Sequence, residues 1–237
     1  MNEFGQLCLL GAMVGSGYAA FACVAGAWRD HRSMVRGGMF ASVASVLLLT
    51  VVGAVLAWAL VAADFRFAYA AQYSSQSLSW YYALSALWAG QAGSLLIWAW
   101  FLGVLALAYA FVSRREPHPI RVSAIGILMG CLCFLVTVMV FAADPMRASI
   151  GSPQTGEGLS PLLQHPVMMI HPPVIFLGYA AWAVPFALAM ASLIHGRADA
   201  AWTRSARSWA LGAWVVLGVG IILGGEWAYE ELGWGGY

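Results

Sequence analysis

The chain has 237 residues, of which 62% are hydrophobic and only 9% are charged. So few charged side chains could not cover a water-soluble globule of this size, so the composition excludes a soluble protein and indicates an integral membrane protein. The net charge of +1 provides no strongly basic surface, which argues against a nucleic-acid partner.

Apolar segments of about 20 residues are long enough to cross the ~30 Å hydrocarbon core of a bilayer as helices. The sequence contains six such segments, and we therefore predict an all-α integral membrane protein, a single transmembrane domain over residues 1–237 with a bundle of about six helices. The predicted spans are residues 7–28, 38–63, 85–113, 122–143, 172–194 and 208–225.

The arginines predict how this bundle is oriented. Three of them lie in each of the first, third and fifth loops, and one lies in each of the second and fourth loops. Cationic loops are retained on the cytoplasmic side, so both termini and two longer outer loops, residues 64–84 and 144–171, are predicted to face the periplasm. The predicted location is the inner (cytoplasmic) membrane, or the mitochondrial inner membrane if the protein is organellar.

His171 directly precedes Pro172 and Pro173, and residues 172–194 carry no formal charge. Proline suits the first turn of a helix, so we expect His171 at or just before the cap of a spanning helix, at the membrane surface. The positive end of a helix favours the neutral imidazole that binds haem iron. Proton transfer or simple anchoring among lipid headgroups fits the residue as well. His165 lies six residues earlier, a spacing that implies no shared metal site.

The last segment of the chain, residues 226–237, alternates aromatic rings with glycines. Glycines between rings let a flat ligand such as a porphyrin approach the backbone while the rings stack on it, and the candidate residues are Trp227, Trp234, Gly235 and Gly236. A tryptophan-rich turn at the membrane interface accounts for the segment equally well.

Three segments resemble one family, CcmF, a cytochrome c-type biogenesis protein of the haem lyase complex. Residues 162–179 resemble its periplasmic haem-histidine region, residues 86–98 its third-helix signature, and residues 227–237 the start of its tryptophan-rich haem motif. The segments occur in the order and at the spacing of the family, and the resemblance covers the whole chain.

The resemblance implies that haem b is held at the periplasmic face for covalent attachment to an apocytochrome c. His171 matches a periplasmic histidine of the family and would be an axial ligand of the haem iron, while Trp227, Trp234, Gly235 and Gly236 would form one wall of the site. Catalytic residues are not identified. The implied partners are the haem chaperone CcmE, apocytochrome-handling subunits of the CcmH/CcmI type, and apocytochrome c.

The sequence departs from the family pattern at several points. Ala92 replaces an acidic residue, Ser160 an asparagine and His165 an aspartate, and the tryptophan-rich motif, which begins near residue 227, is cut at Tyr237. We therefore expect an N-terminal portion of a CcmF-like protein that forms part of a haem lyase and needs the remaining CcmF-like polypeptide to complete its site. A split gene and a diverged fragment retained for structure both fit this expectation.

A different class of function is a non-catalytic membrane scaffold that docks partner chains without binding haem. A Soret band lost on replacing His171 would favour the haem hypothesis, whereas a colourless complex containing every partner would favour the scaffold. A transporter is disfavoured because no predicted span carries the charged residues that mark ion pathways.

Overall fold

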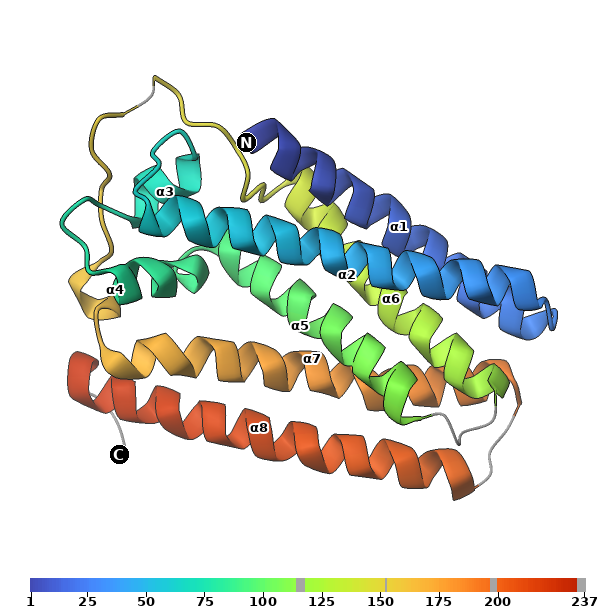
Figure 1. The fold of residues 1–237 in the computed structure, drawn as a ribbon. Coiled ribbons are helices and arrows are strands. Elements are labelled where there is room, and N and C mark those ends of the chain that lie inside the picture. The colour runs from blue at the N-terminus through green and yellow to red at the C-terminus, as the bar shows by residue number, and fades with distance from the viewer. Residues whose placement is uncertain (114–117, 152, 197–199, 234–237) are drawn as a thin grey trace.

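The computed structural model describes residues 1–113, 118–151, 153–196 and 200–233. These residues are almost entirely helical, with no strand among them, as the sequence predicts. Figure 1 shows the arrangement of α1 (Asn2–Trp28), α2 (Arg32–Val61), α3 (Ala68–Tyr73), α4 (Trp80–Ser85), η1 (Ala86–Trp88), α5 (Gln91–Val112), α6 (His118–Phe141), η2 (Pro161–Leu163), α7 (Pro166–Ile194) and α8 (Ala200–Leu232).

Six helices within the described ranges are long and apolar enough to cross a membrane, namely α1, α2, α5, α6, α7 and α8. The predicted bundle of six spans is confirmed. Several helices extend beyond the predicted apolar segments, and the largest extension is in α8, which was expected over residues 208–225. A helix continues through polar residues once it has begun, because each further residue adds a backbone hydrogen bond without a new nucleation cost.

The predicted third span, residues 85–113, is not one helix. It is divided by a turn, with η1 before the turn and α5 after it, and Gly90 in the turn has an extended backbone (φ −114°, ψ 167°). The buried hydroxyl of Tyr69 accepts a hydrogen bond from the Gly90 N–H at 2.9 Å. The same hydroxyl lies 3.1 Å from the carbonyl oxygen of Ala86, to which it can donate its proton. A side chain from α3 therefore satisfies backbone groups that a continuous helix would have paired internally.

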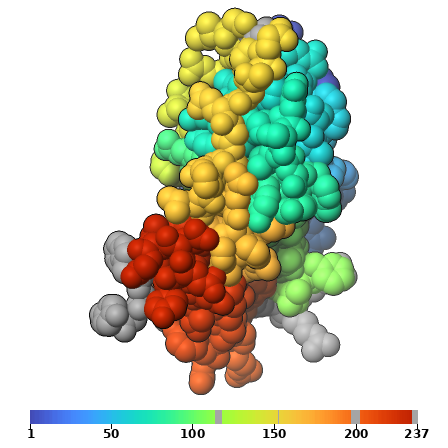
Figure 2. All heavy atoms as spheres, turned by 90° about the vertical axis from the view of Figure 1, so that its left-hand side faces the viewer, coloured from blue at the N-terminus to red at the C-terminus, as the bar shows by residue number. Residues whose placement is uncertain are grey.

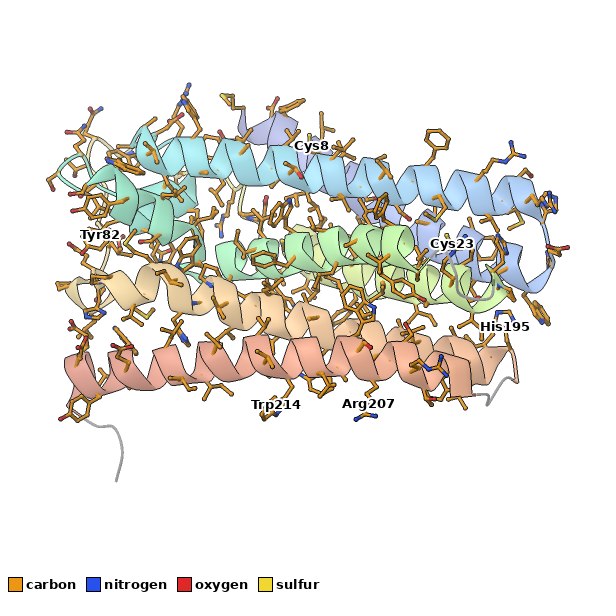
Figure 3. The ribbon with its side chains drawn as sticks, turned by 60° about the horizontal axis from the view of Figure 1, so that its bottom comes forward. Cys8, Cys23, Tyr82, His195, Arg207 and Trp214 are labelled. Atoms are coloured by element: carbon orange, nitrogen blue, oxygen red, sulfur yellow. The ribbon has the colours of Figure 1, made fainter. Side chains whose placement is uncertain are left out.

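The packing order of the long helices places α5 near the centre of the bundle. α1 packs against α2 and α6, α5 contacts α2, α6 and α7, and α7 packs along α8. α8 thus lies at one edge. Arg207 and Trp214 project from α8 away from the other helices in Figure 3, and Trp214 is 67% exposed. Within the described residues, only one side of α8 is covered by protein.

The two long connections meet at one end of the bundle, together with the start of α1 and the end of α8 (Figure 1). An isolated bridge pairs Phe67 with Ala148, and the Ser149 N–H donates to the Arg66 carbonyl at 2.9 Å. Figure 2 views this end directly and shows the α6–α7 connection crossing it towards the C-terminal part of α8. The clustering of the start of α1 and the end of α8 with the long loops agrees with the predicted alternation of the spans.

We expect Tyr69→Phe to destabilise the protein by about 1–3 kcal/mol, because the change leaves buried backbone groups around Gly90 without a partner. Burial raises the pKa of Tyr69, so its hydroxyl stays protonated and can donate throughout the working pH range. Unfolding of the purified protein in detergent measures the effect.

The matched control for that experiment is Tyr73→Phe. The Tyr73 ring packs against Tyr69 with centroids 4.7 Å apart, but its hydroxyl makes no hydrogen bond with the described residues. Equal losses of stability in the two variants would contradict the role given to the Tyr69 hydroxyl.

Candidate functional site

α7 begins six residues earlier than the sequence analysis expects. His165 is its N-cap, with an extended backbone, and its Nδ1 accepts a hydrogen bond from the Val167 N–H at 3.2 Å. Pro166 is the first helical residue, the position that best tolerates a missing N–H. The prediction that His171 lies at the cap is therefore wrong. His171 is in the second turn of α7, where the field of the helix terminus has largely fallen off.

Pro172 and Pro173 consequently lie inside α7 rather than at its start. A proline has no N–H to give to the carbonyl four residues earlier, so Pro172 leaves the Met168 carbonyl without its helical donor. The indole Nε1–H of Trp88 donates to this carbonyl oxygen at 3.0 Å. Trp88 belongs to the segment that resembles the third-helix signature, so this hydrogen bond joins that segment to the histidine-bearing helix.

The imidazole of His171 is oriented by α8. Its Nδ1 lies 2.8 Å from the carbonyl oxygen of Gly220. A carbonyl can only accept, so Nδ1 carries the proton, and in the neutral ring Nε2 keeps its lone pair. Nε2 makes no hydrogen bond with the described residues, and the side chain is half-buried. This is the arrangement in which histidines bind metals, with one nitrogen held by a carbonyl and the other free.

Gly224 lets the ring lie this close to α8. A Cβ atom added at Gly224 would fall 2.5 Å from Cε1 of His171 and 3.0 Å from each ring nitrogen, so any side chain there would displace the imidazole. The adjacent Gly225 is different, because a Cβ at that position meets nothing within 4 Å. Gly220 is one helical turn before Gly224 and provides the carbonyl oxygen, while its own missing side chain leaves room for Ile175 of α7.

The C-terminal part of α8 is attached to the segment before α7 by two contacts. The Trp227 indole N–H donates to the Leu162 carbonyl at 3.1 Å, and His165 Nε2 lies 2.9 Å from a carboxylate oxygen of Glu230. The two ring nitrogens of His165 are thus both in use, one at the helix cap and one at Glu230. Among the histidines of this region, His171 is the one with a nitrogen left over.

The three segments singled out in the sequence meet at the same end of the bundle. Residues 86–98 contact residues 162–179 through Trp88 and Met168 and through the rings of Trp98 and Tyr179, whose centroids are 5.9 Å apart. Residues 162–179 contact α8 through His171 and Gly220 and through Leu162 and Trp227. Of the predicted wall residues, Trp227 lies on α8 near this contact, whereas Trp234, Gly235 and Gly236 fall outside the described residues.

A multidentate metal site built by this chain is absent from the part of the chain that the structure describes, where no group of three or more His, Cys, Asp or Glu side chains could hold a metal ion. An iron held as haem needs fewer protein ligands, because the porphyrin supplies four nitrogens and the protein only axial ligands. A single oriented imidazole fits that demand.

The residues that support His171 are not among those predicted from the sequence. The two consecutive prolines carry a usable signal, because they remove two helical donors and so require an outside donor such as Trp88. Gly220 and Gly224 are harder to identify from the sequence as supports of His171. Gly220 acts through its backbone carbonyl and Gly224 through its lack of a side chain, and neither feature has a distinctive sequence pattern.

The fold and this arrangement define a multi-helix membrane protein in which the His171 imidazole is held by a backbone carbonyl and its Nε2 has no partner among the described residues. The family model described as cytochrome C assembly protein matches residues 88–237, and the chain belongs to that family. The matched region runs from Trp88 through His171 and α8, so it contains residues 162–179 and 227–237 whole and the third-helix segment from Trp88 onward.

Comparison with individual proteins confirms the resemblance to CcmF. The chain is 38% identical to the cytochrome c-type biogenesis protein CcmF of Pseudomonas aeruginosa over 99% of its length, and 38% identical to the probable cytochrome c-type biogenesis protein NrfE of Escherichia coli over 92%. It spans only 36% and 39% of those proteins. A solved structure of the cytochrome c haem lyase CcmF matches all of this chain with a TM-score of 0.82 at 26% identity, over 37% of that structure.

We expect Trp88→Phe to lower stability by about 1–3 kcal/mol, because the Met168 carbonyl loses its indole donor. The same change in a Pro172→Ala background should cost much less, since an alanine at that position restores a helical N–H for the carbonyl. Unfolding of the four proteins of this double-mutant cycle in detergent measures the coupling.

Trp98→Phe is the control for ring size, because the Trp98 indole N–H makes no hydrogen bond with the described residues. If Trp88→Phe costs the same with and without Pro172, the hydrogen bond does not replace the missing helical one.

Proposed function

We propose that this chain forms one side of a haem site at the periplasmic face of the inner membrane, where haem b is held as substrate for covalent attachment to apocytochrome c. In this proposal His171 Nε2 is an axial ligand of the iron. The observation that carries the proposal is the 2.8 Å contact from His171 Nδ1 to the Gly220 carbonyl, which selects the neutral tautomer whose lone pair is on Nε2, an atom without another partner among the described residues.

The contributions of the chain are orientation and electrostatics. A carbonyl acceptor on Nδ1 fixes the tautomer and the plane of the imidazole and increases the basicity of Nε2. The fixed plane selects the porphyrin face that meets the client protein. In the reaction implied by the family, two thiols of the client add across the two vinyl groups of haem, which forms two C–S bonds and transfers each thiol hydrogen to a vinyl carbon. That chemistry belongs to the haem and the thiols.

The flat faces of the haem would be covered from α8 and beyond. Trp227 lies on the same end of α8 as Gly224, and its indole N–H donates a hydrogen bond to the Leu162 carbonyl. We propose Trp227 as part of the wall, together with Trp234, Gly235 and Gly236, which follow it in sequence. Aromatic rings next to glycines suit a planar ligand. The wall is proposed to be completed by the region that corresponds to the rest of CcmF, a protein of which this chain spans 36% in the P. aeruginosa relative.

The orientation and the partners follow from the same proposal. The arginine distribution favours a multi-pass protein with both termini in the periplasm, so the end that carries His171 faces the periplasm. Haem would then arrive from a CcmE-type chaperone, and apocytochrome c would be presented by CcmH/CcmI-type subunits.

We expect His171→Ala to weaken haem binding by about 100-fold or more, since the change removes the axial nitrogen rather than only its support. Titration with haem in nanodiscs, with the region corresponding to the rest of CcmF present and the Soret band as the readout, measures the affinity. His165→Asn is the matched control, because asparagine preserves the helix cap and both nitrogens of His165 are already engaged.

The His171 and His165 variants separate the proposal from its main alternative. Loss of the Soret band with His171→Ala and its retention with His165→Asn support the haem site. A colourless complex that contains every partner chain would overturn the proposal in favour of a scaffold.

A second prediction tests the support of the ligand. Gly224→Ala should push the His171 ring away from Gly220 and weaken haem binding by about tenfold, with a changed Soret position in the haem that still binds. Gly225→Ala adds the same methyl group one residue further along α8, where nothing lies within 4 Å, and should leave both the affinity and the spectrum unchanged. Identical behaviour of the two variants would show that α8 does not orient the imidazole.

A further inference from the structure

A cleft of about 650 Å³ lies at the opposite end of the bundle from His171. It is formed where the end of α1 meets the beginnings of α2 and α6, and its lining residues are Ala27, Asp30, Arg32, Val35, Arg36, His118 and Pro119. Nothing in the proposed haem site involves these residues, so the cleft poses a separate question.

The charges of the cleft favour an anion. Arg32 and Arg36 are four residues apart in the first turns of α2 and so share one face of the helix, and both side chains are exposed. Neither forms an ion pair with a described acidic residue, in contrast to Arg66, which is bound to Asp64 at 2.6 Å. Asp30 is the one carboxylate among the described lining residues, where two guanidinium groups outweigh it.

The polarity of the cleft is divided in a way that fits a lipid better than a small ion. Its floor contains the buried side chains of Ala27 and Val35, which are 9% and 8% exposed, whereas its rim carries the arginines and His118. A lipid headgroup presents the same division, with a phosphate beside an apolar glycerol and acyl region. Inorganic phosphate would contact only the polar rim and would leave the apolar floor of the cleft exposed to water.

The position of the cleft supplies a reason for a lipid to be present. The cleft lies between spanning helices at the end of the bundle that carries the arginine-rich loops, which are predicted to be cytoplasmic. Basic pockets between membrane helices on that side recognise anionic lipid headgroups. Positive charge anywhere in these loops would be enough to keep them on the cytoplasmic side of the membrane. That topological role does not explain why two of the arginines line the same cleft.

We propose that this cleft binds the phosphate of an anionic phospholipid, with Arg32 and Arg36 as the phosphate-binding residues and Ala27 and Val35 in contact with the apolar part of the lipid. Guanidinium groups bind phosphate oxygens through paired N–H donors, and the first-turn N–H groups of α2 add positive potential. This site does not depend on the haem proposal.

The test uses the whole chain in nanodiscs of phosphatidylcholine with or without phosphatidylglycerol. Native mass spectrometry after gentle delipidation counts retained lipids, and a thermal-shift titration compares phosphatidylglycerol with inorganic phosphate. The wild-type protein should retain phosphatidylglycerol and be stabilised by it but not by phosphate. R32Q/R36Q should weaken the apparent affinity by about tenfold or more.

Two further variants keep the outcome interpretable. R204Q/R207Q removes the same charge from exposed arginines of α8 that do not line the cleft, and it should retain the lipid as the wild type does. R32K/R36K keeps the charge that holds the loop on its side of the membrane but lacks the paired donors, and it should give an intermediate affinity.

The remaining outcomes overturn the proposal. Equal losses in R32Q/R36Q and R204Q/R207Q would indicate general attraction of the surface to anionic membranes. Equal stabilisation by inorganic phosphate would show that the cleft accepts a free anion rather than a lipid. If the wild-type protein retains phosphatidylglycerol no better than phosphatidylcholine, the cleft is not a site for anionic lipid.

Discussion

The close contact between α7 and α8 is the interaction on which the proposed haem site depends. His171 on α7 reaches the backbone of α8, and the contact exists because α8 has Gly220 and Gly224 in the facing turn. Without a Cβ at Gly224 the imidazole can lie against the helix and bind the Gly220 carbonyl. That one hydrogen bond sets the tautomer, and the tautomer decides whether Nε2 can bind a metal.

A second constraint is the need to satisfy backbone polar groups where little water is available. Pro172 and Pro173 interrupt the hydrogen bonds of α7, and Gly90 interrupts the predicted third span. In each case an aromatic side chain supplies the missing partner, Trp88 for the Met168 carbonyl and Tyr69 for the Gly90 N–H. The interruptions therefore join separate segments to one another, which a regular helix with all its bonds internal could not do.

The sequence predicts the number and order of the spans because hydrocarbon thickness and hydropathy determine them directly. It does not predict where α7 begins, because Pro166 satisfies the first-turn rule as well as Pro172 does, and the capping by His165 becomes clear only in three dimensions. His171 can be identified from its motif. Its supports cannot, because a backbone carbonyl of Gly220 and the bare Cα of Gly224 have no signature beyond two glycines spaced by one turn.

α8 has one packed side and one open side among the described residues, and this asymmetry has a mechanical consequence. The position of α8 along α7 determines the distance between the Gly220 carbonyl and the imidazole of His171. A movement of α8 along α7 would therefore change the hydrogen bond at Nδ1 and, with it, the basicity of Nε2. The outward face of α8, near Trp214, is not covered by the described residues and is therefore open to another protein surface. If assembly with another subunit moved α8 along α7, it would alter the proposed iron ligand without contacting it.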